Sequence, residues 1–102
     1  MTNEFVPQAI LSRSPAFFTG FGIVFRSGVD DLNKFEVAEL RLEGVPIALM
    51  RHEGTPPDET EVYLPETIPL ARVGPIIRLI MREYDLPPSA LRWQREPGWK
   101  PA

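Results

Sequence analysis

The sequence contains no cysteine and a single histidine. The absence of cysteine excludes disulfide scaffolds, thiolate zinc sites and cysteine nucleophiles. With one imidazole, the chain has no multi-histidine metal site and no catalytic histidine pair. No phosphate-binding glycine loop is found either. We therefore expect neither a metal nor a cofactor.

Long apolar runs and strong net charge are also missing. The longest apolar stretch, residues 16–25, is far shorter than the ~20 residues of a membrane-spanning helix. Its flanks lack the basic start and small-residue cleavage site of a signal peptide. The net charge of −3 argues against a protein that neutralises phosphates along DNA. These features predict a cytoplasmic protein that binds neither membranes nor nucleic acid.

The composition of the chain is otherwise typical of a globular protein. It has 102 residues, of which 43% are hydrophobic and 25% are charged, which is enough for a single domain with one core. Most of the twelve prolines lie at the ends and between the periodic segments. They divide the chain into an N-terminal arm (1–15), a core (16–91) and a C-terminal tail (92–102).

The clearest local signal is a hairpin over residues 35–52. Two β-type runs flank Glu43-Gly44, a plausible two-residue loop. This loop predicts a register with Leu42 opposite Val45, which places a full set of apolar side chains on one face. The same register pairs Glu36 with Arg51.

Further strands are expected at 17–26 and 59–64, with a turn over Gly28–Asn33. Apolar residues recur at helical spacing from Leu70 to Tyr84, which predicts an amphipathic helix with Ile77 and Ile80 in the core. The predicted fold is therefore α+β: a four-stranded antiparallel sheet, one C-terminal helix packed on one face, and irregular proline-rich termini.

One helix leaves the second face of this sheet open. The hairpin register directs Phe35, Val37 and Met50 to that face, and the tail adds Trp93 and Trp99. Large apolar side chains in water usually mark an interface. We expect these five residues to form a homodimer or other homo-oligomer interface, the alternative being that the termini fold back over the face.

His52 and Tyr63 are candidate ligand-binding residues. Histidine is a common general base, and the carboxylates Asp58, Glu59 and Glu61 follow it in the chain. The plainer interpretation is a strand end beside acidic, solvated residues. No serine lies in a nucleophile elbow, so no residue is assigned as catalytic and His52 is expected to be dispensable.

Arg78 and Arg82 lie one turn apart on the polar side of the predicted helix. Residues 71–102 carry six basic and three acidic residues (+3), and residues 1–70 carry five and eleven (−6). These arginines are candidates for binding an anionic small molecule or an acidic protein. Alternatively, they pair with the acidic part of their own chain.

No protein family is indicated by these motifs. The sequence favours a small non-enzymatic binding or protein-interaction module that self-associates. A first alternative is a small-molecule-binding domain or small enzyme with a pocket near His52. A second is an RNA-binding accessory protein that uses the Arg- and Trp-rich C-terminal region.

Overall fold

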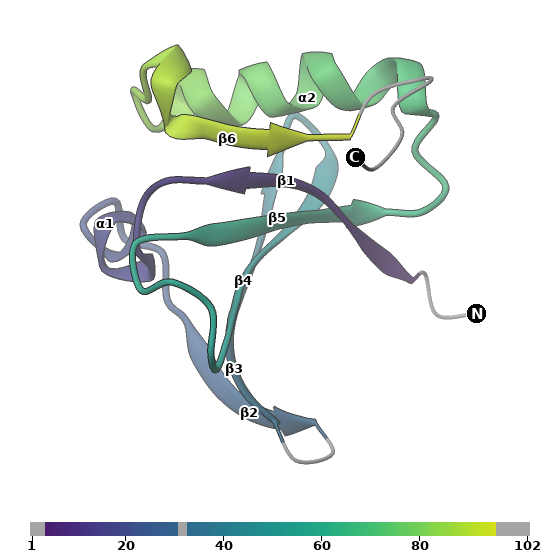
Figure 1. The fold of residues 1–102 in the computed structure, drawn as a ribbon. Helices are drawn as coiled ribbons and strands as arrows, with labels where there is room; N and C mark the ends of the chain where they lie inside the picture. Colours follow the sequence, from purple (N-terminus) through teal and green to yellow (C-terminus); the bar gives the residue numbers. More distant parts are fainter. Residues whose placement is uncertain (1–3, 31–32, 96–102) are drawn as a thin grey trace.

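A computed structural model describes residues 4–30 and 33–95 and shows a single six-stranded sheet in which every pair of neighbours is antiparallel (Figure 1). Across the sheet the strands follow the order β2 (Arg26–Asp30), β3 (Asn33–Leu42), β4 (Val45–His52), β5 (Thr60–Pro65), β1 (Phe5–Leu11) and β6 (Leu91–Gln94). The edges are therefore β2 and β6.

The helices lie on one face of the sheet, which we call the core face. They are α1 (Pro15–Thr19), α2 (Leu70–Glu83) and the short 3-10 helix η1 (Pro88–Ala90). The predicted helix is confirmed, with Ile77 and Ile80 fully buried against strand residues such as Leu49. The opposite face, which we call the open face, carries no helix of the described chain (Figure 1).

The predicted hairpin register is confirmed. Leu42 faces Val45 and Glu36 faces Arg51 in the pairing of β3 with β4. Glu43 and Gly44 both have positive φ, of 47° and 80°, as a tight two-residue hairpin turn requires. Apolar alternation and a compatible turn thus specify the same register.

The prediction of a four-stranded sheet is wrong, because the two ends of the chain add strands to it. Residues 5–11, assigned to an arm, form β1 between β5 and β6, and residues 91–94 form β6 at the edge. Pro7 is unusual in a central strand, because proline has no backbone N–H to donate to the neighbouring strand. It is accommodated at a register shift between Pro7 and Ala9, where the pairing with β5 is irregular.

The expected strand over 17–26 is also wrong. Pro15 occupies the first turn of α1, a position that proline favours, and the chain stays helical to Thr19. The aromatic spacing suits this helix: Phe17 and Phe21 lie one turn apart with ring centroids 5.4 Å apart. The strand begins instead at Arg26 and includes Gly28, which was predicted to lie in a turn.

Part of the sheet projects beyond the helices. We call this part the wing: strand β2, residues 33–37 of β3 and residues 50–52 of β4. In Figure 1 it extends away from α2, which lies over the end of the sheet formed by β5, β1 and β6.

Candidate functional site

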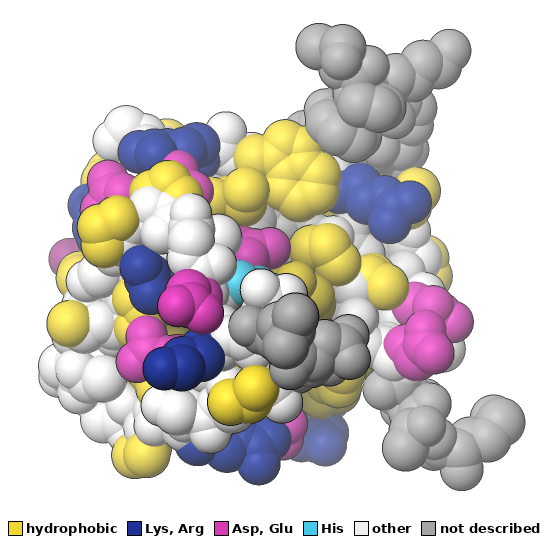
Figure 2. Space-filling view, turned by 60° about the horizontal axis from the view of Figure 1, so that its bottom comes forward, with side chains coloured by type: hydrophobic (Ala, Val, Ile, Leu, Met, Phe, Trp, Pro, Cys, Tyr) yellow, Lys and Arg dark blue, Asp and Glu magenta, His cyan; other side chains and the backbone are white. Residues whose placement is uncertain are grey.

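Polar and aromatic side chains meet on the open face where β4 and β5 lie side by side. His52 Nδ1 lies 3.2 Å from Glu61 Oε1, and the Tyr63 hydroxyl donates to Glu61 Oε2 at 3.4 Å. The His52 ring lies between those of Phe35 and Tyr63, at centroid distances of 6.2 and 6.5 Å. Figure 2 shows part of the imidazole at the surface, between acidic and hydrophobic side chains. The structure thus brings the two candidates His52 and Tyr63 together.

Glu61 holds this cluster in place. It faces Met50 in the pairing of β4 with β5, so its carboxylate reaches both ring side chains. Two other acidic residues that follow His52, Asp58 and Glu59, pair instead with Arg92. Sequence reasoning anticipated a carboxylate partner for His52, and the strand register decides which one it is.

Burial raises the pKa of Tyr63 to about 12, and the negative charge of Glu61 and the hydrogen bond to it add to the effect. All three causes favour the neutral phenol, which keeps its proton as the hydrogen-bond donor. Tyr63 therefore serves as a donor on this face at neutral pH. It is not a base.

This shift predicts a stability change at high pH. Below pH 10 the phenol is neutral in folded and unfolded chains, so its contribution is fully present. As the pH rises from 10 towards 12, the unfolded chain loses the proton first and the free energy of unfolding falls. Denaturant titrations of wild type and Tyr63→Phe across this range should show a shallower fall in the variant. Parallel curves would contradict the assigned environment.

The predicted interface residues differ in exposure. Phe35 and Met50 are half-buried on the open face, whereas Val37 is only 5% exposed although no helix covers it. Val37 lies between two neighbouring strands, opposite Arg26 of β2 and Met50 of β4. Val37 contributes packing to the wing, and Phe35 and Met50 provide the accessible apolar surface.

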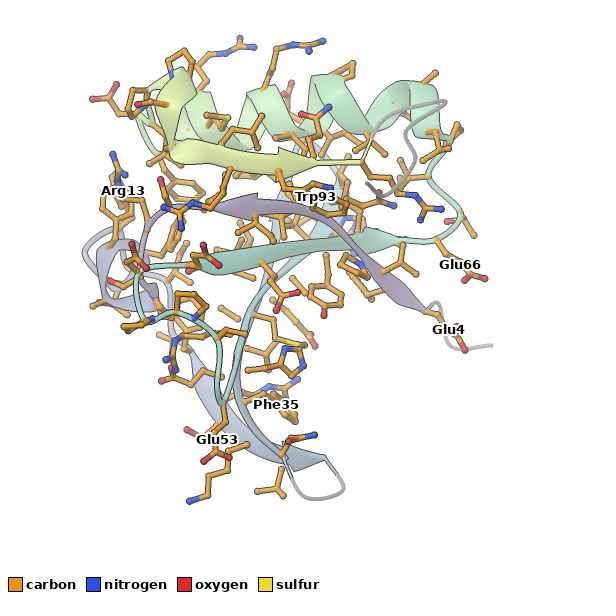
Figure 3. All side chains as sticks on the ribbon, in the orientation of Figure 1. Glu4, Arg13, Phe35, Glu53, Glu66 and Trp93 are labelled. Carbon is orange, nitrogen blue, oxygen red and sulfur yellow. The ribbon has the colours of Figure 1, made fainter. Side chains whose placement is uncertain are left out.

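The remaining candidate residues lie elsewhere. Trp93 is on β6, far from Phe35 on the wing (Figure 3). Arg78 and Arg82 are exposed on α2 and line a separate surface cavity of about 580 Å³. Trp99 lies outside the described residues. The structure therefore does not join the Arg and Trp candidates to the His52 cluster.

Sequence reasoning missed a cavity of about 590 Å³ on the other side of the wing, lined by Lys34, Glu36, Arg51 and Glu53 among others. Arg51 donates from Nη2 to the Thr55 carbonyl oxygen at 3.2 Å, which ties the following loop to β4. Within the described chain, no carboxylate lies within 4.0 Å of this guanidinium, although Glu36 faces Arg51 across the strands. The opposite-charge pair predicts the register correctly without forming an ion pair.

Hydrogen bonding on the open face is suited to binding. In the described part of the chain, the side-chain hydrogen-bond partner of His52 is Glu61, and no serine or threonine hydroxyl contacts the imidazole. No group of three or more potential metal-ligating side chains occurs among residues 4–30 and 33–95. Over the same residues, no helix has the length and hydropathy needed to span a bilayer.

Comparison of the chain with protein-family models, curated proteins and solved structures found no match. The functional argument therefore depends on the geometry of this molecule.

Proposed function

We propose that this protein is a small interaction module that self-associates through the wing of its sheet and has no catalytic role. The observation that carries the proposal is the projection of the wing beyond α2 (Figure 1). The wing has apolar side chains on both of its faces. Phe35 and Met50 are half-buried on the open face. On the opposite face, Val29 is 70% exposed.

A second copy of this chain is the partner that best fits the wing. A stable homodimer buries at least ~1,000 Å² in total, which is about 500 Å² from each copy. The chain exposes 6543 Å², so such a contact requires less than a tenth of its surface. Aromatic residues and methionine are enriched in such contacts, and the wing offers both. The proposal includes the cytoplasm as the compartment, as the sequence composition suggests.

Sedimentation at micromolar concentration tests the proposal. We expect a species of twice 11.6 kDa for the wild type and a shift towards 11.6 kDa for Phe35→Ser, which removes the largest apolar side chain of the wing. Phe21→Ser is the matched control, since Phe21 is 50% exposed and lies between α1 and β2, outside the wing. A wild type that stays at 11.6 kDa throughout the concentration range would refute self-association.

A further inference from the structure

We infer that two copies of this chain join edge to edge through β2, antiparallel about a two-fold axis at Gly28, so that their sheets form one continuous sheet. This inference rests on the proposed self-association and specifies the contact that produces it. The support comes from the free edge of β2, the direction of its backbone groups and the symmetry of these groups about Gly28.

The two edges of the sheet differ in how they are covered. Edge strand β6 runs beside α2, and a Cβ added at Gly74 of that helix would lie 3.3 Å from the Gln94 side-chain nitrogen (Figure 1). Strand β2 has β3 as its one neighbour in the sheet. No described element lies along its other side. Backbone groups on that side are therefore available to a further strand.

The direction of these groups follows from the neighbouring strands. Glu53 N donates to the Lys34 carbonyl oxygen at 2.8 Å, so the backbone groups of Lys34 face β4. Lys34 pairs with Val29, and in an antiparallel ladder such a pair directs both backbones away from each other. Val29 therefore presents its N–H and C=O to the free edge. Ser27, two residues earlier, does the same.

Natural edge strands are usually protected against pairing. Lysine, proline and β-bulges are the common devices. Strand β2 has none of these three: its sequence is Arg-Ser-Gly-Val-Asp, with charged residues only at its two ends, and its register with β3 is continuous over all five residues. Val29 is 70% exposed and Val24, just before the strand, is 83% exposed. This edge therefore favours the addition of another strand.

The outward backbone groups of β2 are complementary to those of its own two-fold copy. An antiparallel pairing centred on Gly28 places Ser27 opposite Val29 of the second copy, so that the outward N–H and C=O of each residue meet those of the other. Two-fold symmetry produces this pairing twice. A second copy thus meets the requirements of the edge without any other partner.

Gly28 connects the contact between the two β2 strands, which we call the seam, to the open face. A Cβ at this position would lie 2.4 Å from Cζ of Phe35, so the ring packs directly over the glycine. A two-fold axis at Gly28 runs perpendicular to the sheet, so the Phe35 rings of both copies lie on the same face of the joined sheet. The contact therefore includes the aromatic side chain on which the proposed function depends.

Substitution of the edge tests the seam in the full-length chain. Ser27→Pro removes an outward N–H from both copies while leaving the ladder to β3 intact. By sedimentation, we expect the dimer to dissociate at least ~30-fold more readily, because two hydrogen bonds are lost. Ser27→Ala, the matched control, retains the backbone group and should dimerise like the wild type. Val29→Lys provides a second disruption that does not alter the backbone.

Hydrogen exchange supplies a direct readout. The amides of Ser27 and Val29 should become protected as the wild-type concentration rises, whereas a contact through the open face alone leaves them exchanging freely. If the wild type dimerises but both edge variants still dimerise equally well, the seam is refuted and self-association stands. If the wild type is monomeric, both proposals fail.

Discussion

Phe18→Ala should lower the free energy of unfolding by about 3–5 kcal/mol, the usual cost of truncating a buried aromatic side chain. Phe18 is fully buried in the core, and its ring meets those of Phe17 and Tyr84 edge-on at centroid distances of 5.2 and 5.4 Å. Truncation leaves a cavity between α1 and the end of α2. Since small domains have about 5–15 kcal/mol of stability, this loss is a large part of the total.

Denaturant unfolding measures this effect, and Phe21→Ala is its control. Phe21 also contacts the Tyr84 ring, at 5.2 Å, but half of its surface is exposed. Its truncation should cost roughly 1 kcal/mol, mostly from the lost ring contact. Equal losses for the two variants would show that α1 is not anchored through Phe18.

The sequence predicted the parts of the fold in which local signals agree. In the 35–52 hairpin, apolar alternation and the Glu43-Gly44 turn specify the same pairing, and the structure has it. Around Phe18 the signals compete, because clustered aromatic residues suit a strand and a short helix equally well. Pro15 at the first helical position and the packing against Tyr84 favour the helix.

Strands β1 and β6 were missed for a different reason. Each depends on partners that are remote in the sequence: β1 pairs with β5, and β6 joins β1 only after the chain has passed through α2. Pro7 also disrupts the usual strand pattern, and it is tolerated because the pairing shifts register beside it. Such strands are defined by tertiary pairing, and local propensity contributes little.

The candidate site was likewise predicted only in part, since residue types are read from the sequence and strand order is not. His52 and Tyr63 were predicted from their residue types and strand positions, and the structure places them on either side of Glu61. The predicted interface joined Phe35 with Trp93, but these residues belong to β3 and β6, near opposite edges of the sheet. Their separation depends on strand order, which composition and periodicity do not encode.

Ile77→Ala should cost about 2–4 kcal/mol, because the truncation leaves a cavity between α2 and the sheet. Ile77 is fully buried at the centre of the helix face that packs on the core. Leu70→Ala, in the first turn of the same helix and 37% exposed, should cost less than about 1 kcal/mol. Denaturant unfolding of both variants checks the difference. A loss below 1 kcal/mol for Ile77→Ala would mean that the apolar stripe of α2 does not pack on the sheet as the structure has it.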